Sequence, residues 1–129
     1  MIGDYAHHRV LGLSIRMKSG FWKEAAMRID NLTLKNFRNF ENAEIPLNPK
    51  MNIVIGNNGS GKSSLLMGAL TAASTFFLGI DYASPRSIKA EDVRHVAYET
   101  NKIYQQREVY PVEVSCQGVV NGSACTWSR

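Results

Sequence analysis

Glycines, a lysine and a serine stand at fixed intervals near the middle of the chain. Residues 56–63 have the sequence Gly-Asn-Asn-Gly-Ser-Gly-Lys-Ser, which fits the phosphate-binding pattern G-x-x-x-x-G-K-S/T at each fixed position. Glycines let a backbone curl so that successive N–H groups point inward, and a helix that follows directs its positive end to the same point. The segment therefore predicts a site for the polyphosphate of a nucleoside triphosphate.

Each residue type in this loop suits one role in binding a magnesium–nucleotide complex. Lys62 would reach the β- and γ-phosphate oxygens as a point charge, which also makes it the predicted catalytic residue, and the Ser63 hydroxyl would ligate Mg²⁺. Backbone N–H groups from Asn58 to Ser64 would surround the phosphates. The predicted binding set in the loop is Gly56, Asn57, Asn58, Gly59, Ser60, Gly61, Lys62, Ser63 and Ser64.

The residues on either side of the loop predict the strand and the helix that such a site needs. Residues 51–55 (Met-Asn-Ile-Val-Ile) form a short, nearly continuous apolar run, which predicts a strand buried on both faces of a parallel sheet. Apolar residues recur at helical spacing after Lys62, and Gly79 is placed to cap that helix at its C-terminus. Strand, loop and helix in this order argue against a chance glycine loop.

Two further pairs of strands are predicted at the ends of the domain. Apolar residues alternate with polar ones from Met27 to residue 47, and Asn39, Glu41 and Asn42 favour a turn between two antiparallel strands. Near the C-terminus, alternating apolar residues flank Asn121-Gly122, a dipeptide typical of a tight hairpin turn.

The register of that C-terminal hairpin follows from its turn. It would place Val120 opposite Ser123, Gly118 opposite Cys125 and Cys116 opposite Trp127. One face of the hairpin then collects Val112, Val114, Cys116, Val120, Cys125 and Trp127. As diagonal neighbours, the two cysteines lie beyond easy disulfide reach, so we expect reduced thiols.

Residues 80–108 carry weaker patterns. A ragged apolar face suggests a helix within residues 90–104, and Glu91, Asp92, Arg94 and Glu99 would then lie on its solvated side.

Length and composition bound the architecture. With 129 residues, 44% of them hydrophobic, the chain can form one domain or part of one. The net charge of +4 suits a polyphosphate ligand without requiring a nucleic acid. No apolar stretch approaches the roughly 18 residues of a membrane span, and the N-terminus lacks the apolar core of a signal peptide, so we expect a cytoplasmic protein without membrane contact.

The folded domain is predicted to occupy residues 27–129. Residues 1–26 show no sustained period. They could be a flexible extension, the product of an upstream start, or a short amphipathic element around Val10 to Ile15, and the sequence does not choose among these.

The features needed for hydrolysis and for reading the base are not evident. Hydrolysis calls for a second carboxylate near the metal. The segment most similar to such a motif is the apolar run that ends at Asp81, but it belongs to the end of the helix that follows the glycine loop. Asn101-Lys102 begins like a guanine-reading N-K-x-D motif, but Tyr104 stands where its Asp would be, so ATP is favoured over GTP.

A resemblance emerges from two segments. The sequence Met27-Arg-Ile-Asp-Asn-Leu-Thr-Leu-Lys-Asn-Phe-Arg, followed by the glycine loop, resembles the opening of RecF/SMC-like ATPases of the ABC class. Asp92-Val-Arg and the closing Thr126-Trp-Ser-Arg are also similar to bacterial AAA-family ATP-binding proteins from virulence or phage-defence loci. The resemblance covers about residues 27–129 and corresponds to the N-terminal portion of such proteins.

The resemblance implies an α/β fold: the N-terminal lobe of an ABC/SMC-like P-loop NTPase, with antiparallel hairpins, a buried strand, a glycine loop and a helix. It also implies that Asn58 touches the γ-phosphate side and that Arg38 lies near the phosphates or the adenosine. A surface position for Arg38 beside a strand end is the alternative. Later family motifs, namely a serine-glycine signature, a Walker B Asp-Glu pair and a switch histidine, have no counterpart here. Gln105, Gln106 and Gln117 are equal candidates for a Q-loop glutamine.

Three functions are compatible with these patterns. The first is an ATPase lobe in which ATP joins two protomers and hydrolysis releases them, coupled by analogy to DNA or to a nuclease partner. The second is a nucleotide-binding module without turnover, or a truncated ATPase with a regulatory role. A GTPase switch is disfavoured, because the guanine-reading motif is incomplete and an antiparallel pair precedes the loop.

Overall fold

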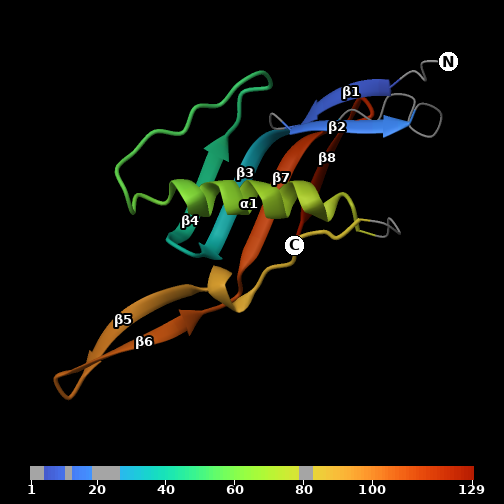
Figure 1. Ribbon diagram of the computed structural model, residues 1–129. Coiled ribbons are helices and arrows are strands. Elements are labelled where there is room, and N and C mark those ends of the chain that lie inside the picture. The colour runs from blue at the N-terminus through green and yellow to red at the C-terminus, as the bar shows by residue number, and fades with distance from the viewer. Residues whose placement is uncertain (1–4, 11–12, 19–26, 79–82) are drawn as a thin grey trace.

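The computed structural model describes the backbone of residues 5–10, 13–18, 27–78 and 83–129, and the side chains of the last two ranges. One long helix packs on a four-stranded sheet, and a two-stranded hairpin extends from the lower end of that sheet (Figure 1). The elements in chain order are β1 (Tyr5–Val10), β2 (Leu13–Lys18), β3 (Met27–Phe37), β4 (Phe40–Pro46), α1 (Lys62–Thr75), the 3-10 helix η1 (Ala90–Asp92), β5 (Arg94–Thr100), β6 (Ile103–Val109), β7 (Glu113–Val120) and β8 (Ser123–Ser128).

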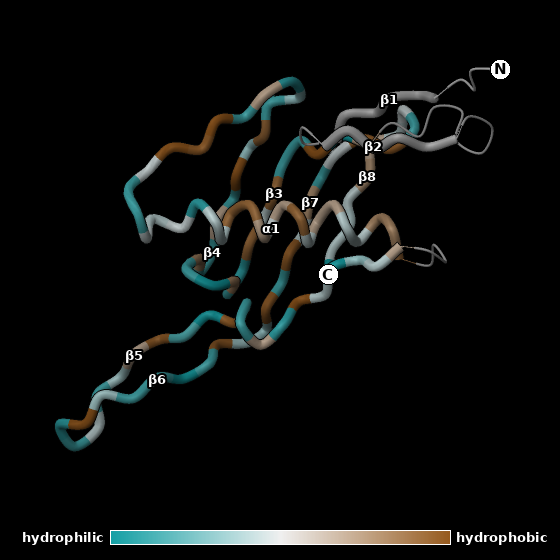
Figure 2. The backbone as a smooth tube through the Cα atoms, in the orientation of Figure 1, coloured by the Kyte–Doolittle hydropathy of each residue, from teal (hydrophilic) through white to brown (hydrophobic). Residues whose placement is uncertain are grey.

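The main sheet is antiparallel and has the strand order β4-β3-β7-β8. In its centre Leu32 lies opposite Cys116 and Leu34 lies opposite Val114, and all four are at most 2% exposed. Polar residues occupy the alternate positions, as Figure 2 shows along β7. One face of the sheet is therefore apolar and the other polar, which is the usual arrangement for an antiparallel sheet covered on one side.

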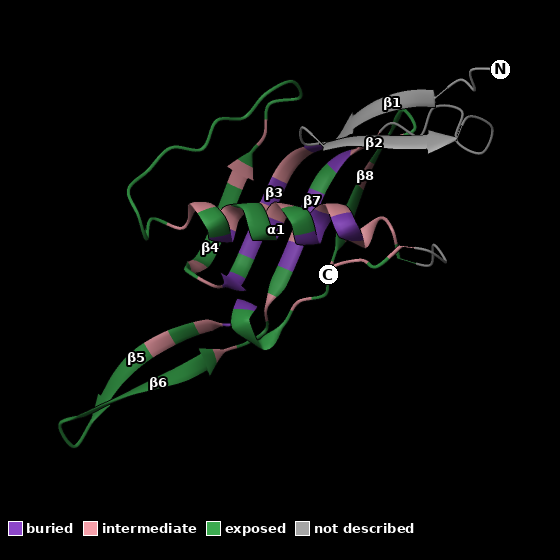
Figure 3. Cartoon of the chain, viewed as in Figure 1, coloured by how far each residue is buried: buried purple, intermediate pink, exposed green. Residues whose placement is uncertain are grey.

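Helix α1 covers the apolar face. A side chain on Gly68 would meet Leu34, whose Cδ2 would lie 2.6 Å from an added Cβ, so the backbone of the helix approaches the sheet closely. The indole Nε1 of Trp127 donates to the carbonyl oxygen of Ala72 at 3.0 Å and ties β8 to the helix. Buried residues are accordingly concentrated on β3, β7 and the inner side of α1 (Figure 3).

Both predicted strand pairs are present. The C-terminal hairpin has the expected register, with Gly118 opposite Cys125 and Cys116 opposite Trp127. Both cysteines are free, as expected. The predicted position of the turn between β3 and β4 is wrong in part. The turn consists of Arg38 and Asn39, with Phe37 opposite Phe40, whereas the sequence placed it at the cluster from Asn39 to Asn42.

The predicted strand at residues 51–55 is wrong. These residues form no strand, and Met51, Ile53 and Ile55 are 71%, 78% and 87% exposed. A strand needs neighbours for its backbone hydrogen bonds, and in the described part of the chain neither edge strand, β4 or β8, pairs with this segment. Instead it belongs to the long loop that links β4 to α1 (Figure 1).

The predicted helix within residues 90–104 is also wrong. Its first residues form η1, and the rest form the hairpin β5–β6, whose turn residues Asn101 and Lys102 both have positive φ. The side chains of both strands are mostly exposed, and the hairpin pairs only with itself among the described elements (Figure 3).

The remaining expectations concern the end of helix α1, residues 1–26 and membrane-spanning segments. Helix α1 ends at Thr75, and the predicted cap Gly79 lies outside the described residues. Strands β1 and β2, which lie within residues 1–26, pair in antiparallel fashion, and the sequence patterns did not indicate them. No helix in the described ranges has the length and apolar character of a membrane span.

Candidate nucleotide-binding site

The glycine loop curls directly into helix α1. Gly59 and Gly61 have φ values of 82° and 95°, in the left-handed region that favours glycine, and Gly61 is the N-cap of the helix. A side chain at Gly61 would also crowd Phe40, whose Cζ would lie 3.2 Å from the added Cβ. The first residue of β4 therefore fixes how closely the loop can approach the sheet.

Lys62 folds back across the start of the loop. Its Nζ donates to the carbonyl oxygens of Gly56 and Asn57, each at 2.6 Å. The N–H of Ser60 also donates to the Asn57 carbonyl, at 3.2 Å. The loop thus closes around its own ammonium group. Lys62 is the first residue of α1, so the unpaired N–H groups of the first helical turn lie in the same region.

The remaining predicted loop residues fall into two groups. Asn58 and Ser63 are exposed, whereas Ser64 is only 7% exposed and its hydroxyl donates to Oδ1 of Asn39 at 3.4 Å. The amide of Asn39 in turn donates to the Gly59 carbonyl at 3.5 Å. Asn39 was not predicted as a site residue. Its position in the β3–β4 turn, directly after Arg38, is the signal that could have identified it.

Arg38 lies at the end of β3 and is held by a buried carboxylate. Its Nε donates to Oδ1 of Asp92 at 2.8 Å, and its backbone N–H donates to the Asp92 carbonyl at 2.7 Å. Its φ of 50° is unusual for a residue other than glycine, asparagine or aspartate, and this pair of hydrogen bonds holds it there. Arg38 is 22% exposed, so it is neither a fully solvated surface residue nor a buried one.

Asp92, Arg38 and Arg86 form an arginine cluster around the Asp92 carboxylate. This contradicts the prediction that Asp92 lies on a solvated helix face. Its side chain is 0% exposed. The carboxylate accepts hydrogen bonds from Arg38 Nε, from both terminal nitrogens of Arg86, at 2.8 and 2.9 Å, and from the Lys89 N–H, at 3.0 Å. All the acceptor sites of the carboxylate are therefore used.

The protonation of Asp92 follows from these contacts. Desolvation by burial would by itself raise the pKa of the carboxyl group, but the hydrogen bonds from Arg86, Lys89 and Arg38 outweigh it and lower the pKa to about 2. Asp92 is therefore charged at neutral pH, and its charge is shared between two guanidinium groups.

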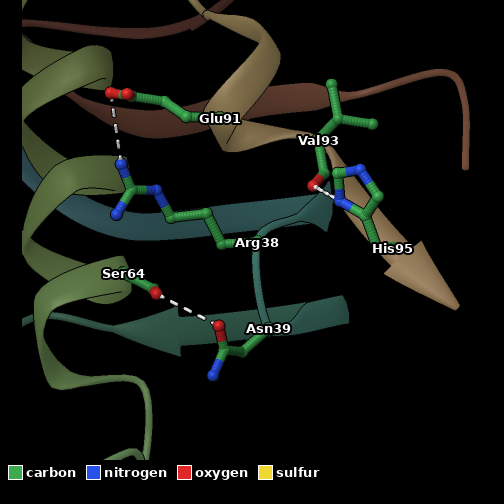
Figure 4. A pocket seen from close by; sticks show the side chains of 6 residues that line it. All are labelled: Arg38, Asn39, Ser64, Glu91, Val93 and His95. Atoms are coloured by element: carbon green, nitrogen blue, oxygen red, sulfur yellow. Dashed lines mark hydrogen bonds and ion pairs between the residues drawn. The ribbon is translucent and has the colours of Figure 1, made fainter. Parts of the chain in front are cut away.

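A pocket of about 270 Å³ connects the arginine cluster with the start of α1. Its lining consists of Arg38, Asn39, Ser64, Glu91, Val93 and His95. Figure 4 shows these side chains arranged around it, with Arg38 facing Glu91 and Ser64 facing Asn39. Asn39 also contacts Gly59, and Ser64 directly follows residues 56–63, so the pocket lies beside the glycine loop.

Within the described ranges, no group of three or more His, Cys, Asp or Glu residues could hold a metal ion. Burial, with a smaller contribution from Cys125, raises the pKa of the Cys116 thiol to about 12, so this residue is a packed core thiol.

Comparison with known proteins identifies the family of the chain. Residues 27–104, more than half of the chain, match the family model described as AAA ATPase domain. The chain belongs to the AAA ATPase domain family. The matched segment begins with β3 and includes the glycine loop, α1 and the arginine cluster.

Curated relatives point to one type of protein within this class. The chain is 46% identical over 76 residues to the DNA replication and repair protein RecF of Colwellia psychrerythraea, a match that covers 58% of this chain and 18% of RecF. It is 29% identical over 92 residues to RecF of Phocaeicola vulgatus, covering 70% of this chain and 23% of that protein. The match to RecF of Clostridium acetobutylicum is 55% over 40 residues, covering 31% of this chain and 11% of that protein.

The matches confirm the resemblance to the N-terminal portion of RecF/SMC-like P-loop ATPases. They also support membership of a class of ATP-binding ATPases, and the α/β structure with its antiparallel strands fits the N-terminal region of a P-loop NTPase. The matched part corresponds to no more than about a quarter of the length of these relatives.

Proposed function

We propose that this chain binds ATP with Mg²⁺ through the loop at residues 56–63 and acts as the N-terminal lobe of a RecF/SMC-like ATPase. The observation that carries the proposal is the position of Lys62, whose ammonium group is held by the carbonyl oxygens of Gly56 and Asn57. Within the described residues no carboxylate lies within 4 Å of this ammonium group. Its charge is therefore available to an incoming anion.

The triphosphate would enter where the loop already gathers donors. The N–H groups of the first turn of α1 and the turn around Gly59 would face the phosphate oxygens, and Lys62 would turn from the carbonyls to the β- and γ-phosphates. In this position it would also stabilise charge that develops during phosphoryl transfer. These roles follow the residue types and the family, and a ligand-bound structure would test them directly.

The Ser63 hydroxyl fits a role as a magnesium ligand because the residue is exposed at the start of the helix, beside Lys62. Mg²⁺ prefers six oxygen ligands and usually keeps several water molecules, so one hydroxyl together with phosphate oxygens and water would be sufficient. The ion, when bound, would neutralise part of the phosphate charge. Arg38, through the adjoining pocket, would contribute the second cationic group.

The wider role follows from the relatives. RecF is named for DNA replication and repair, and by analogy the nucleotide state of this chain would be coupled to DNA or to a nuclease partner in the cytoplasm. An ATP-dependent homodimer is the form in which such coupling would operate.

The binding proposal is tested by calorimetric titration with Mg-ATP and with Mg-GTP. We expect Mg-ATP to bind more tightly, and Lys62→Ala to weaken ATP binding by at least about 100-fold. Lys102→Ala serves as the matched control, because it removes the same charge from the exposed tip of the β5–β6 hairpin. Equal ATP affinity in the Lys62 variant and the wild-type chain would refute the assignment of the loop.

A further inference from the structure

The arginine cluster behind the pocket, taken as Arg38, Arg86 and Asp92 alone, contains more positive than negative charge. Arg38 and Arg86 share the single carboxylate of Asp92, which leaves one positive charge without a buried partner. The nearest group that balances it is Glu91, whose Oε1 lies 3.6 Å from Arg38 NH2 and 3.9 Å from Arg86 NH2. With Glu91 included, the charges of the cluster sum to zero.

The two carboxylates of the cluster are held very differently. Asp92 is fully buried and accepts four hydrogen bonds, so it is a fixed part of the fold. The Glu91 side chain is 61% exposed, and its distances to the guanidinium groups exceed those of a hydrogen bond. An exposed ion pair of this kind contributes little to stability and is easily exchanged for another anion.

The ion pair lies at the wall of the pocket that adjoins the glycine loop. Arg38 and Glu91 both line this pocket, together with Ser64 from the first turn of α1 and Asn39, which contacts Gly59 (Figure 4). An anion placed on the loop and extending into the pocket would therefore meet the same face of Arg38 that Glu91 now occupies. It would also be repelled by the Glu91 carboxylate.

We propose that Glu91 is an internal counterion of Arg38 and that the phosphate chain of a bound nucleotide displaces it. This inference rests on the proposed function, because it requires a nucleotide on the glycine loop. Asp92 keeps Arg38 in place throughout, while Glu91 neutralises the free edge of the guanidinium group only until the ligand arrives. Glu91 therefore lowers the affinity of the site for anions and keeps the empty pocket neutral.

The proposal predicts that the affinity for ATP rises when the charge of Glu91 is removed. Glu91→Gln keeps the size of the side chain but removes its charge, so the ligand no longer breaks an ion pair or meets a carboxylate. We expect ATP to bind about fivefold more tightly, and uncharged adenosine to bind the variant and the wild-type chain equally. Glu99→Gln, with the same charge change on an exposed residue of β5, should leave ATP affinity unchanged.

A second variant establishes whether the gain acts through Arg38. In the Arg38→Gln background, Glu91→Gln should have no effect on ATP affinity, because the counterion then has no partner. If Arg38→Gln does not fold, Arg38→Lys keeps a positive charge for Asp92 but lacks the terminal nitrogen that faces Glu91, and the gain should fall below twofold. All affinities are measured by calorimetry at one ionic strength, since screening reduces the effect.

The outcomes separate this inference from the proposed function. Unchanged or weaker ATP binding by Glu91→Gln overturns the counterion role, as does a gain that persists without Arg38, while Lys62-dependent ATP binding by the wild-type chain would still support the loop. If the wild-type chain binds no ATP, or binds it independently of Lys62, the proposed function and this inference both fail.

Discussion

Two cationic groups border the same candidate site, and they are held in opposite ways. Lys62 sits in an exposed loop and is held by neutral carbonyl oxygens, whereas Arg38 is fixed by the buried carboxylate of Asp92. A charge with neutral partners can be transferred to a ligand at little cost to the fold. A charge that satisfies a buried acid cannot, because the acid would be left alone in the interior. Lys62 can therefore change partners, whereas Arg38 stays fixed to Asp92 and could offer a ligand only the terminal nitrogen that faces Glu91.

Stability measurements should show the largest contrast between the two regions. Asp92→Ala removes the acceptor of four hydrogen bonds and leaves Arg86, which is 13% exposed, without its partner. We expect it to lower the free energy of unfolding by about 3–5 kcal/mol. Lys62→Ala should change it by less than about 0.5 kcal/mol. Urea denaturation of both variants measures these two changes. Similar losses of unfolding free energy in the two variants would contradict the proposed difference between the arginine cluster and the loop.

The arginine cluster should also make the free energy of unfolding depend on pH, whereas the glycine loop should not. The pKa of Asp92 is lowered from an ordinary 3.8 to about 2 in the folded state, so its contribution is complete above about pH 5 and is lost as the pH falls toward 2. The lost free energy of unfolding is about 2 kcal/mol.

Denaturation of wild type and Asp92→Asn at several pH values isolates this contribution. The difference in free energy between the two proteins should shrink by about 2 kcal/mol between pH 6 and pH 2. For Lys62→Ala, the difference from wild type should stay constant over that range. A constant difference for Asp92→Asn would contradict the charged, hydrogen-bonded state of this residue.

Within the loop, the two left-handed glycines should differ. Gly59→Ala meets nothing within 4 Å, so it carries only the backbone cost of positive φ, about 1 kcal/mol. Gly61→Ala carries the same cost and also crowds Phe40, so we expect a loss nearer 2 kcal/mol. Thermal unfolding of the two variants tests whether contact with β4 fixes the loop. Equal losses would mean that Phe40 moves aside freely.

The smallest expected effect concerns turnover. From the residues of this chain we expect phosphate release from ATP at a rate no greater than that of the Lys62→Ala variant, because the sequence supplies no recognisable second acidic motif for hydrolysis. A phosphate-release assay on the same samples as the binding titration measures it. Steady release by the wild-type chain that Lys62→Ala abolishes would show that binding and chemistry are both present in these residues.

Two hairpins explain how far the sequence could predict the fold. In β7–β8 one face is buried, so apolar and polar residues alternate, and the turn residues are Asn121-Gly122. In β5–β6 the strands are mostly exposed, so no alternation is imposed on them. Its turn uses Asn101 and Lys102 in the same left-handed region, but lysine at the second position conceals the signal. A β-sheet pattern is readable only where burial enforces it.

The candidate site shows the same limit. The glycine loop could be identified because its pattern lies within consecutive residues, 56–63. The anchoring role of Asp92 is not, since its partner Arg38 lies 54 residues away in the sequence and pairing depends on the tertiary fold. Residues 51–55 illustrate the opposite error, in which an apolar run predicts burial that the described part of the chain does not provide.

The pairing of β3 with β7 has a consequence for the order of folding. During synthesis β3 can pair with β4 at once, but its other neighbour emerges only after the loop, the helix and the β5–β6 hairpin have been made. Until then Leu32 and Leu34 belong to an open strand edge, and closing so long a stretch of chain is entropically slow. In the nascent chain the unpaired backbone groups of β3 therefore stay exposed until β7 has been made. This interval is the one in which the chain is most prone to aggregate.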